Sequence, residues 1–224
     1  MLRERRHGAG RSSRVRLAAV FVGCVLALAA LGWLGTPVAQ ALEGVSYSEE
    51  ELAFVRLLNE YRAGNGLGSL VISDTISQSC DRHNSDMAKY GFFDHYTAGS
   101  DWFAKGSTPS ERMILCGYDY KTVMGENLAG GCSTAGQALE GWQNSPTHRA
   151  IMLRDDLKVI GVSLVYVSGS EWGYYWTTEF GGYVDSTAGI TTTTSPTLKS
   201  LAEVPSARLA DRGLWRRLLF DIRI

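Results

Sequence analysis

Cysteine is scarce in this chain of 224 residues, which contains four. Cys24 lies in the N-terminal apolar run, and an odd number remains at Cys80, Cys116 and Cys132. At most one bridge can therefore form within the mature chain, which excludes a small scaffold held together by disulfides. Cys116 and Cys132 bracket a glycine-rich stretch and are the pair that we expect to be joined. By the chain-entropy model such a bridge contributes about 3 kcal/mol of stability.

A surplus of positive charge is also absent from the middle of the chain. The formal net charge is −1. Six Arg against one Glu in residues 1–41, and six Lys or Arg against three acidic residues in 198–224, leave −9 for residues 42–197. An acidic core lacks the electrostatic footprint of nucleic-acid binding, so no nucleic-acid partner is expected.

Long apolar runs are missing except at the N-terminus, where arginines precede an apolar segment from Leu17 to Gly35. Ala39-Gln40-Ala41 supplies the small-x-small pattern that a signal peptidase cleaves, so residues 1–41 are predicted to be a signal peptide. The run is nearly long enough to span a bilayer, which keeps an uncleaved signal anchor open. A lipobox at Cys24 is disfavoured because Phe21 stands where Leu is preferred. All three alternatives predict export, to a secreted or cell-surface location.

The remaining chain divides by composition into one domain and two appendages. Residues 42–185 are the size of a single domain. Residues 186–197 are Thr-rich and predict a linker. Residues 198–224 are basic and amphipathic, and two interpretations remain open: a loosely attached or disordered end, or a helix at a membrane interface.

Two amphipathic helices are predicted at the start of the domain. Ser48 and Glu51 form a capping box ahead of the first helix, which ends near Gly64. The second runs from about Asp74 to a stop at Gly91, with one face that carries Ile76, Cys80, His83, Met87 and Tyr90. Thiol, imidazole and thioether on one face suggest a metal site, but core packing with a hydrogen-bonded histidine explains the pattern better.

Three polar residues stand where a site is expected. His95 follows the second helix, in a loop after two phenylalanines. Glu126 lies between Gly125 and Asn127 in what we predict to be a sharp turn. His148 falls in the first turn of a helix opened by Ser145-Pro146, where the helix dipole favours neutral imidazole, the form that binds metals or accepts protons.

The later part of the domain predicts strands. Residues 157–167 and 172–184 are rich in β-branched and aromatic residues and are joined by a short polar turn, which indicates a hairpin buried on both faces. A sheet that is covered on both faces needs helices on both. The predicted fold is therefore α+β, a three-layer α-β-α sandwich with a central antiparallel sheet.

Several motifs in order carry a resemblance to a known family. They are FFDHY from Phe92, MGENLAGG from Met124, WQNSPTHR from Trp142, the Gly161-Val162 step and TTEFG from Thr177. Over about residues 50–185 the chain resembles bacterial members of the CAP superfamily, the cysteine-rich secretory, antigen 5 and pathogenesis-related proteins. The resemblance implies an α-β-α sandwich of the CAP (SCP) type with a solvent-open cleft.

The resemblance also implies a ligand set in that cleft. Eukaryotic members line it with two histidines and two acidic residues, which match His95, Glu126 and His148, while Ser145 stands at the place of the second acid. Glu179 is the candidate carboxylate to substitute for it, and Asn127 is a further candidate at the cleft. The set is expected to bind Zn²⁺ weakly, with no cofactor required.

Three functions are compatible with these residues. The first is a non-enzymatic binding domain for a metal ion, a lipid or a peptide. The second is a metal-dependent hydrolase that uses His95, Glu126 and His148, with Ser145 or Glu179 for attack or proton transfer. The third is a structural or adhesive surface protein. No nucleophile elbow is present in the chain, so we favour the binding domain, with membrane contact expected only through an uncleaved N-terminus or the tail.

Overall fold

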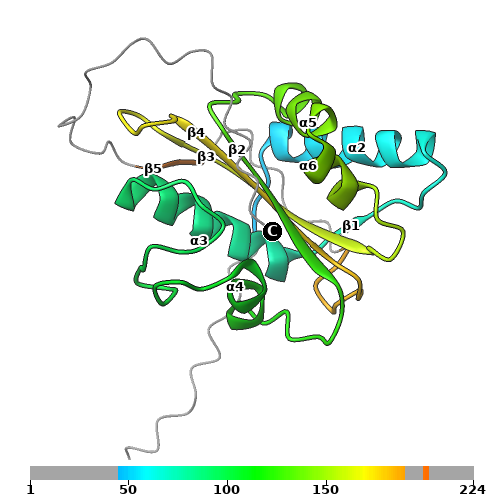
Figure 1. Ribbon diagram of the computed structural model, residues 1–224, viewed down its shortest axis with the longest axis horizontal. Coiled ribbons are helices and arrows are strands. Elements are labelled where there is room, and N and C mark those ends of the chain that lie inside the picture. The colour runs from blue at the N-terminus through cyan, green and yellow to red at the C-terminus, as the bar shows by residue number, and fades with distance from the viewer. Residues whose placement is uncertain (1–44, 190–198, 202–224) are drawn as a thin grey trace, which may run out of the picture. The chain divides into compact units, whose positions relative to one another are not determined.

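The computed structural model describes residues 45–189 and 199–201 (Figure 1). The predicted signal peptide or anchor, most of the Thr-rich linker and nearly all of the basic tail lie outside these residues. Within the described part of the chain, no helix is long and apolar enough to cross a membrane.

The first two helices begin and end where their sequence signals place them. Helix α2 spans Glu49–Gly64 and opens with the predicted capping box, in which the side chains of Ser48 and Glu51 each bind the backbone of the other residue. Helix α3 spans Asp74–Tyr90 and ends at Gly91, whose φ of 67° is the left-handed conformation that glycine adopts without strain. Both predictions are confirmed.

The sheet is built around the predicted hairpin. Strand β3 spans Val159–Val167 and β4 spans Tyr174–Gly181, and the two pair antiparallel. Strand β2, Met124–Gly130, pairs antiparallel with β4 on its other side. Two short strands, β1 at Val71–Ile72 and β5 at Lys199–Leu201, add to β3 in parallel. The central sheet is antiparallel, as predicted, and gains two parallel additions at one edge.

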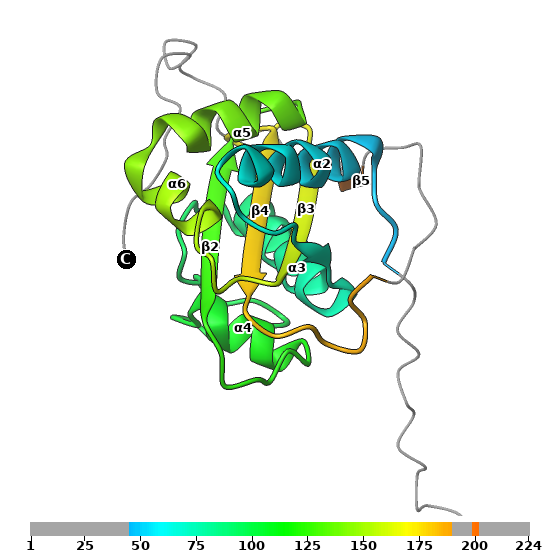
Figure 2. The same cartoon turned by 90° about the vertical axis from the view of Figure 1, so that its right-hand side faces the viewer.

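Helices cover both faces of this sheet, which gives the predicted three layers (Figures 1 and 2). Helices α3 and α4, the latter at Pro109–Leu115, lie on one face. Helices α2, α5 at Ala135–Asn144 and α6 at Pro146–Met152 lie on the other. The larger core is between this second helical layer and the sheet, where the ring of Phe54 lies 5.2 Å from that of Trp142 and 5.6 Å from that of Trp176.

One predicted element is wrong. The segment around Glu126 is not a sharp turn but the regular edge strand β2, paired residue by residue with β4. Its glycines serve close packing rather than a change of direction. A Cβ on Gly130 would lie 2.9 Å from the indole of Trp172, and one on Gly125 would lie 3.1 Å from Ile151.

Between β1 and β5, side chains form hydrogen bonds with the backbone of β3 at positions where neither strand pairs with it. The backbone N–H of Val162 donates to the hydroxyl of Ser77 at 3.2 Å. The N–H of Leu164 donates to the buried carboxylate of Glu51 at 2.8 Å. These contacts fill the gap between β1 and β5 and satisfy backbone groups that would otherwise pair with another chain.

The predicted disulfide is also wrong, because Cys80, Cys116 and Cys132 are all free thiols. Cys116 ends α4, where Arg82 of α3 approaches its sulfur at 3.5 Å. Cys132 follows β2 and packs in the core formed with α2 and α5. The two cysteines therefore belong to opposite faces of the sheet, although they flank the same segment in sequence.

The segment after β4 stays attached to the domain beyond the predicted boundary at residue 185. The N–H of Gly189 donates to the carbonyl of Ile72 at 2.9 Å, and Ala188 forms a β-bridge with Ser73. The first residues of the Thr-rich stretch therefore belong to the sheet edge.

Candidate functional site

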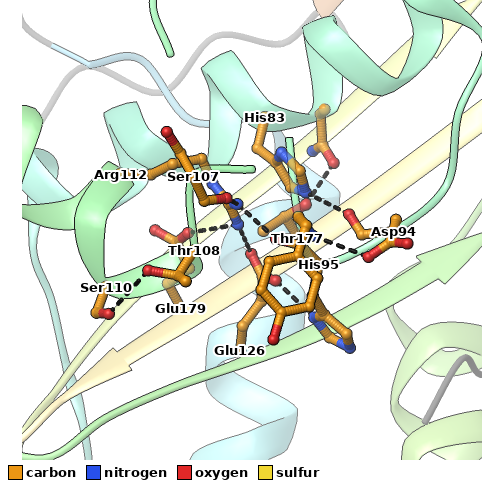
Figure 3. A network of polar contacts seen from close by, with 12 residues as sticks. His83, Asp94, His95, Ser107, Thr108, Ser110, Arg112, Glu126, Thr177 and Glu179 are labelled. Atoms are coloured by element: carbon orange, nitrogen blue, oxygen red, sulfur yellow. Dashed lines mark hydrogen bonds and ion pairs between the residues drawn. The ribbon is translucent and has the colours of Figure 1, made fainter. Parts of the chain in front are cut away.

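Four side chains from four elements meet at a polar centre on the α3 and α4 side of the sheet (Figure 3). Glu126 of β2 and Glu179 of β4 are direct cross-strand partners, so their side chains project from the same face. Arg112 comes from α4, whose start is fixed by a capping box at Thr108 and a proline at the first position. His95 comes from the loop that follows the Gly91 stop of α3.

The carboxylate of Glu126 is held on both oxygens. Its Oε1 lies 2.6 Å from Nδ1 of His95. Its Oε2 accepts a charge-assisted hydrogen bond from Nη2 of Arg112. The same Nη2 lies 3.3 Å from Oε1 of Glu179, so one guanidinium bridges the two carboxyl groups, as Figure 3 shows.

Arg112 also holds the loop that carries His95. Its Nη1 donates to the carbonyl of His95 at 2.6 Å and to that of Ser107 at 3.3 Å. The arginine and Glu179 are fully buried. The polar centre is therefore anchored to α4, to the loop and to both strands at once.

Two buried carboxyl groups share one permanent cation, and their charge states differ accordingly. Burial alone would raise the pKa of Glu126, but the charge of Arg112 and the hydrogen bond from His95 outweigh it and hold that pKa at about 2. For Glu179, burial and then the neighbouring charge of Glu126 raise the pKa well above its ordinary value, against the effect of Arg112. Glu126 is therefore ionised at neutral pH, whereas the environment of Glu179 favours its protonated form.

His83 lies behind this centre and is the hydrogen-bonded core histidine that the sequence predicts. Its Nε2 donates to the carbonyl of Asp94 at 3.0 Å, next to His95 (Figure 3). Complete burial, and then the charge of Arg112, lower its pKa to about 3. A neutral His83 therefore holds the His95 loop through the carbonyl of Asp94.

His148 occupies the first turn of α6, as predicted, and lies close to a serine. Its Nδ1 is 2.7 Å from Oγ of Ser145. Ser145 stands at the N-cap position of α6, where a serine is expected to cap the helix, but its side chain makes no capping hydrogen bond. Asn127 is fully buried and donates from Nδ2 to the carbonyl of His148 at 3.3 Å.

The side chains of the predicted set are not arranged as a metal centre. Among residues 45–189, no group of three or more histidine, cysteine or carboxylate side chains is arranged to hold one. Each carboxylate oxygen of Glu126 already accepts a hydrogen bond within the fold, Oε1 from His95 and Oε2 from Arg112. The predicted set of His95, Glu126 and His148 is thus not assembled as a metal centre, and weak zinc binding stays an untested prediction.

Arg112 is the residue that sequence reasoning missed, and Glu179 was only a secondary candidate. The cross-strand register that pairs Glu179 with Glu126 could not be read from either segment alone. One signal was available: two glutamates in segments that are otherwise buried require a buried counter-charge. Arg112, next to the capping-box glutamate at the start of an apolar helix, was a candidate for it.

Comparisons with known proteins agree on the family. The family model described as the cysteine-rich secretory protein family (CAP) matches residues 55–180. The YkwD protein of Bacillus subtilis is 36% identical over 139 residues, which cover 61% of this chain and 49% of that protein. The membrane protein YlbC of the same organism is 27% identical over 51% of this chain and 31% of its own length. The chain thus spans half or less of the curated relatives that it matches.

Two solved structures share the fold. An extracellular SCP-domain protein from Bacillus anthracis superposes with a TM-score of 0.50 and 22% identity, over 60% of this chain and 40% of that one. An outer surface protein of Borrelia burgdorferi gives a TM-score of 0.50 and 22% identity, over 61% of this chain and 95% of that one. At this identity the likeness concerns the fold alone. With the family model covering most of the three-layer domain, the chain belongs to the cysteine-rich secretory protein (CAP) family.

Proposed function

We propose that this protein is an exported, non-enzymatic binding domain. The observation that carries the proposal is the occupation of Glu126, whose two carboxylate oxygens are held by His95 and Arg112. A general base or a catalytic metal ligand needs a lone pair directed at substrate or metal. This carboxylate has both of its oxygens engaged within the fold, which suits a scaffold for binding better than a reaction centre.

Export is supported by the N-terminal segment and by the fold neighbours. Arginines, an apolar run and Ala39-Gln40-Ala41 have the order of a signal peptide. The two solved structures that share the fold are described as extracellular and outer-surface proteins. We therefore place the domain outside the cytoplasmic membrane.

The binding position that we propose is the rim above the polar centre. His95 exposes 11% of its side chain, and the neighbouring Tyr96 is 45% exposed. The aromatic ring of Tyr96 offers apolar contact and the imidazole of the preceding residue offers a polar group, the combination that ligand sites commonly use. A lipid or a peptide is the ligand class that matches these groups.

A hydrolase is the second candidate, and one contact favours it. Oγ of Ser145 lies 2.7 Å from Nδ1 of His148, which is within the reach required of a nucleophile and its base. Ser145 and His148 are 7% and 3% exposed, however, which leaves little access for a substrate.

Two assays on the exported protein distinguish these candidates. A fluorescent fatty acid such as cis-parinaric acid, and a labelled random peptide library, report binding, whereas p-nitrophenyl esters, casein and a fluorophosphonate probe report hydrolysis. We expect saturable binding of the fatty acid or of peptides, with no turnover and no labelling of Ser145. Failure to bind either probe contradicts the proposal. Turnover that is lost in Ser145→Ala or His148→Ala establishes the hydrolase instead.

A further inference from the structure

The cation of the polar centre is a residue of the chain. We infer that Arg112 takes the place that a divalent metal would occupy between Glu126, Glu179 and His95, so that the centre is complete in charge without a metal. The inference goes beyond the proposed function, because a metal-free centre is compatible with more than one activity. It rests on the position of the guanidinium, on the space that it occupies, on its permanent charge and on the burial of the polar centre.

Position comes first. The Nη2 atom of Arg112 contacts Oε2 of Glu126 and lies 3.3 Å from Oε1 of Glu179. The imidazole of His95 binds the other oxygen of Glu126 at 2.6 Å. Two carboxylates and one imidazole are the ligand types that a zinc ion accepts. The guanidinium thus sits among donors that suit a metal.

Occupancy excludes a metal beside the arginine. A divalent ion bound to Glu126 and Glu179 would lie within a few ångströms of the guanidinium, in a buried environment where like charges repel strongly. The ion would have to displace Arg112.

Displacement is opposed by the other contacts of the arginine. Its Nη1 is fixed by the carbonyls of His95 and Ser107 at 2.6 and 3.3 Å, and the side chain is fully buried. A guanidinium does not give up its proton at any ordinary pH, unlike a lysine or a histidine. A metal therefore cannot gain the site by deprotonating its competitor.

The burial of the centre leaves no open coordination position of the kind that a catalytic metal needs. Such a metal keeps an open position for water or substrate, whereas Arg112 and Glu179 have no exposed side-chain surface. What remains accessible is the edge of His95. A ligand at the rim therefore meets an imidazole ordered by Glu126 and Arg112, without a metal ion.

Removal of the guanidinium supplies the test, and the chain offers a matched control. Arg62 is also buried, and its partners among the described residues are backbone carbonyls, those of Gly68, Met152 and Arg154. Arg112→Ala leaves two carboxylates and an imidazole around a vacated volume. Arg62→Ala leaves a similar volume with no carboxylate contact.

Isothermal titration of the full chain with Zn²⁺ decides the matter. We expect no stoichiometric binding of Zn²⁺ to the wild type and a gain of at least about tenfold in affinity for Arg112→Ala. Arg62→Ala should show no gain in affinity, and the double variant Arg112→Ala/Glu126→Gln should lose the gain. Should Arg112→Ala fail to fold alone, Zn²⁺ is expected to restore its folding, because the metal supplies the missing charge. One zinc per wild-type chain that is lost in Glu126→Gln overturns the inference. So does an Arg112→Ala chain that gains neither affinity nor folding from zinc.

Discussion

Glu126 and Glu179 carry the same side chain in neighbouring strands, yet their surroundings shift the two pKa values in opposite directions. Both contact Arg112, but Glu126 also accepts from His95, whereas burial dominates at Glu179. The ionised form of Glu126 is stabilised by two partners, and the neutral form of Glu179 avoids a second buried charge. This difference makes the two residues a matched pair for substitution by glutamine.

The first prediction is that the two glutamine variants differ in stability. Glu126→Gln removes the anion that neutralises Arg112 and is expected to lower the free energy of unfolding by about 3 kcal/mol at pH 7. Glu179→Gln replaces a carboxyl group whose neutral form burial favours by an amide of the same shape, and is expected to change the free energy of unfolding by less than about 1 kcal/mol. Urea unfolding measures both. A larger loss of unfolding free energy for Glu179→Gln than for Glu126→Gln would mean that Glu179, and not Glu126, is the ionised partner of Arg112.

The second prediction concerns the thiols. Cys116 is partly exposed, whereas Cys80 and Cys132 are buried. Burial foremost raises the pKa of Cys116 to about 11, so its labelling by iodoacetamide is expected to be slow at pH 7.5 and to accelerate as pH rises. Cys80 and Cys132 should react only after unfolding. Peptide mass spectrometry measures the labelling of each cysteine. If Cys116 and Cys132 both stay unlabelled until a reductant is added, the two residues form a disulfide and this prediction is wrong.

The site was only partly predictable at this scale. His95 and Glu126 were identified from motif order, and the structure joins them at 2.6 Å. Arg112 was missed because its partners lie on two strands that are distant in sequence and meet only through the register of β2 and β4. Contacts of this kind are set by tertiary packing, of which a single sequence carries no local signal.

Elements with local start and stop signals were predicted well, and those without were not. The bounds of α2 and α3 follow from side-chain caps and a left-handed glycine, all encoded within a few residues. Strand β2 was mistaken for a turn because glycine is usual in turns and uncommon in strands. Its glycines are instead required by Ile151 and Trp172, which pack against them from elsewhere in the chain.

Gly161 shows the same principle between α3 and the sheet. A Cβ at this position would lie 2.4 Å from the backbone of Ile76 and 2.6 Å from that of Ser77. The first turn of α3 can therefore approach β3 only over a glycine. This contact also brings Ser77 to the edge of β3, where it accepts from Val162.

The third prediction tests that approach with two glycine-to-alanine variants. Gly161→Ala is expected to cost about 1–3 kcal/mol or more, because the obstacle is backbone that cannot rotate away. Gly136→Ala, in α5 with nothing within 4 Å, is expected to stabilise by up to about 1 kcal/mol. Thermal unfolding compares them. Equal melting temperatures for the two variants would contradict the packing described here.

The molecule as a whole combines a CAP domain with a polar centre that the chain neutralises by itself. The three-layer fold was predicted from a hairpin buried on both faces and the family from ordered motifs, and the family model and the two fold neighbours confirm them. Export and the bound ligand remain proposals. The buried ion pair between Arg112 and Glu126 is the feature through which the stability of the whole domain should depend most strongly on pH.

The pH dependence of unfolding tests this central claim most directly. The folded pKa of Glu126, about 2, lies below its ordinary value of 4.5. Its contribution to stability is therefore fully present above pH 4.5 and is lost as pH falls towards 2. Urea unfolding of the wild type and of Glu126→Gln from pH 7 to pH 2 should give a gap in free energy that is constant above about pH 5 and closes between 4.5 and 2. A gap of unchanged size across that range would mean that folding does not lower the pKa of Glu126, and would contradict the claim.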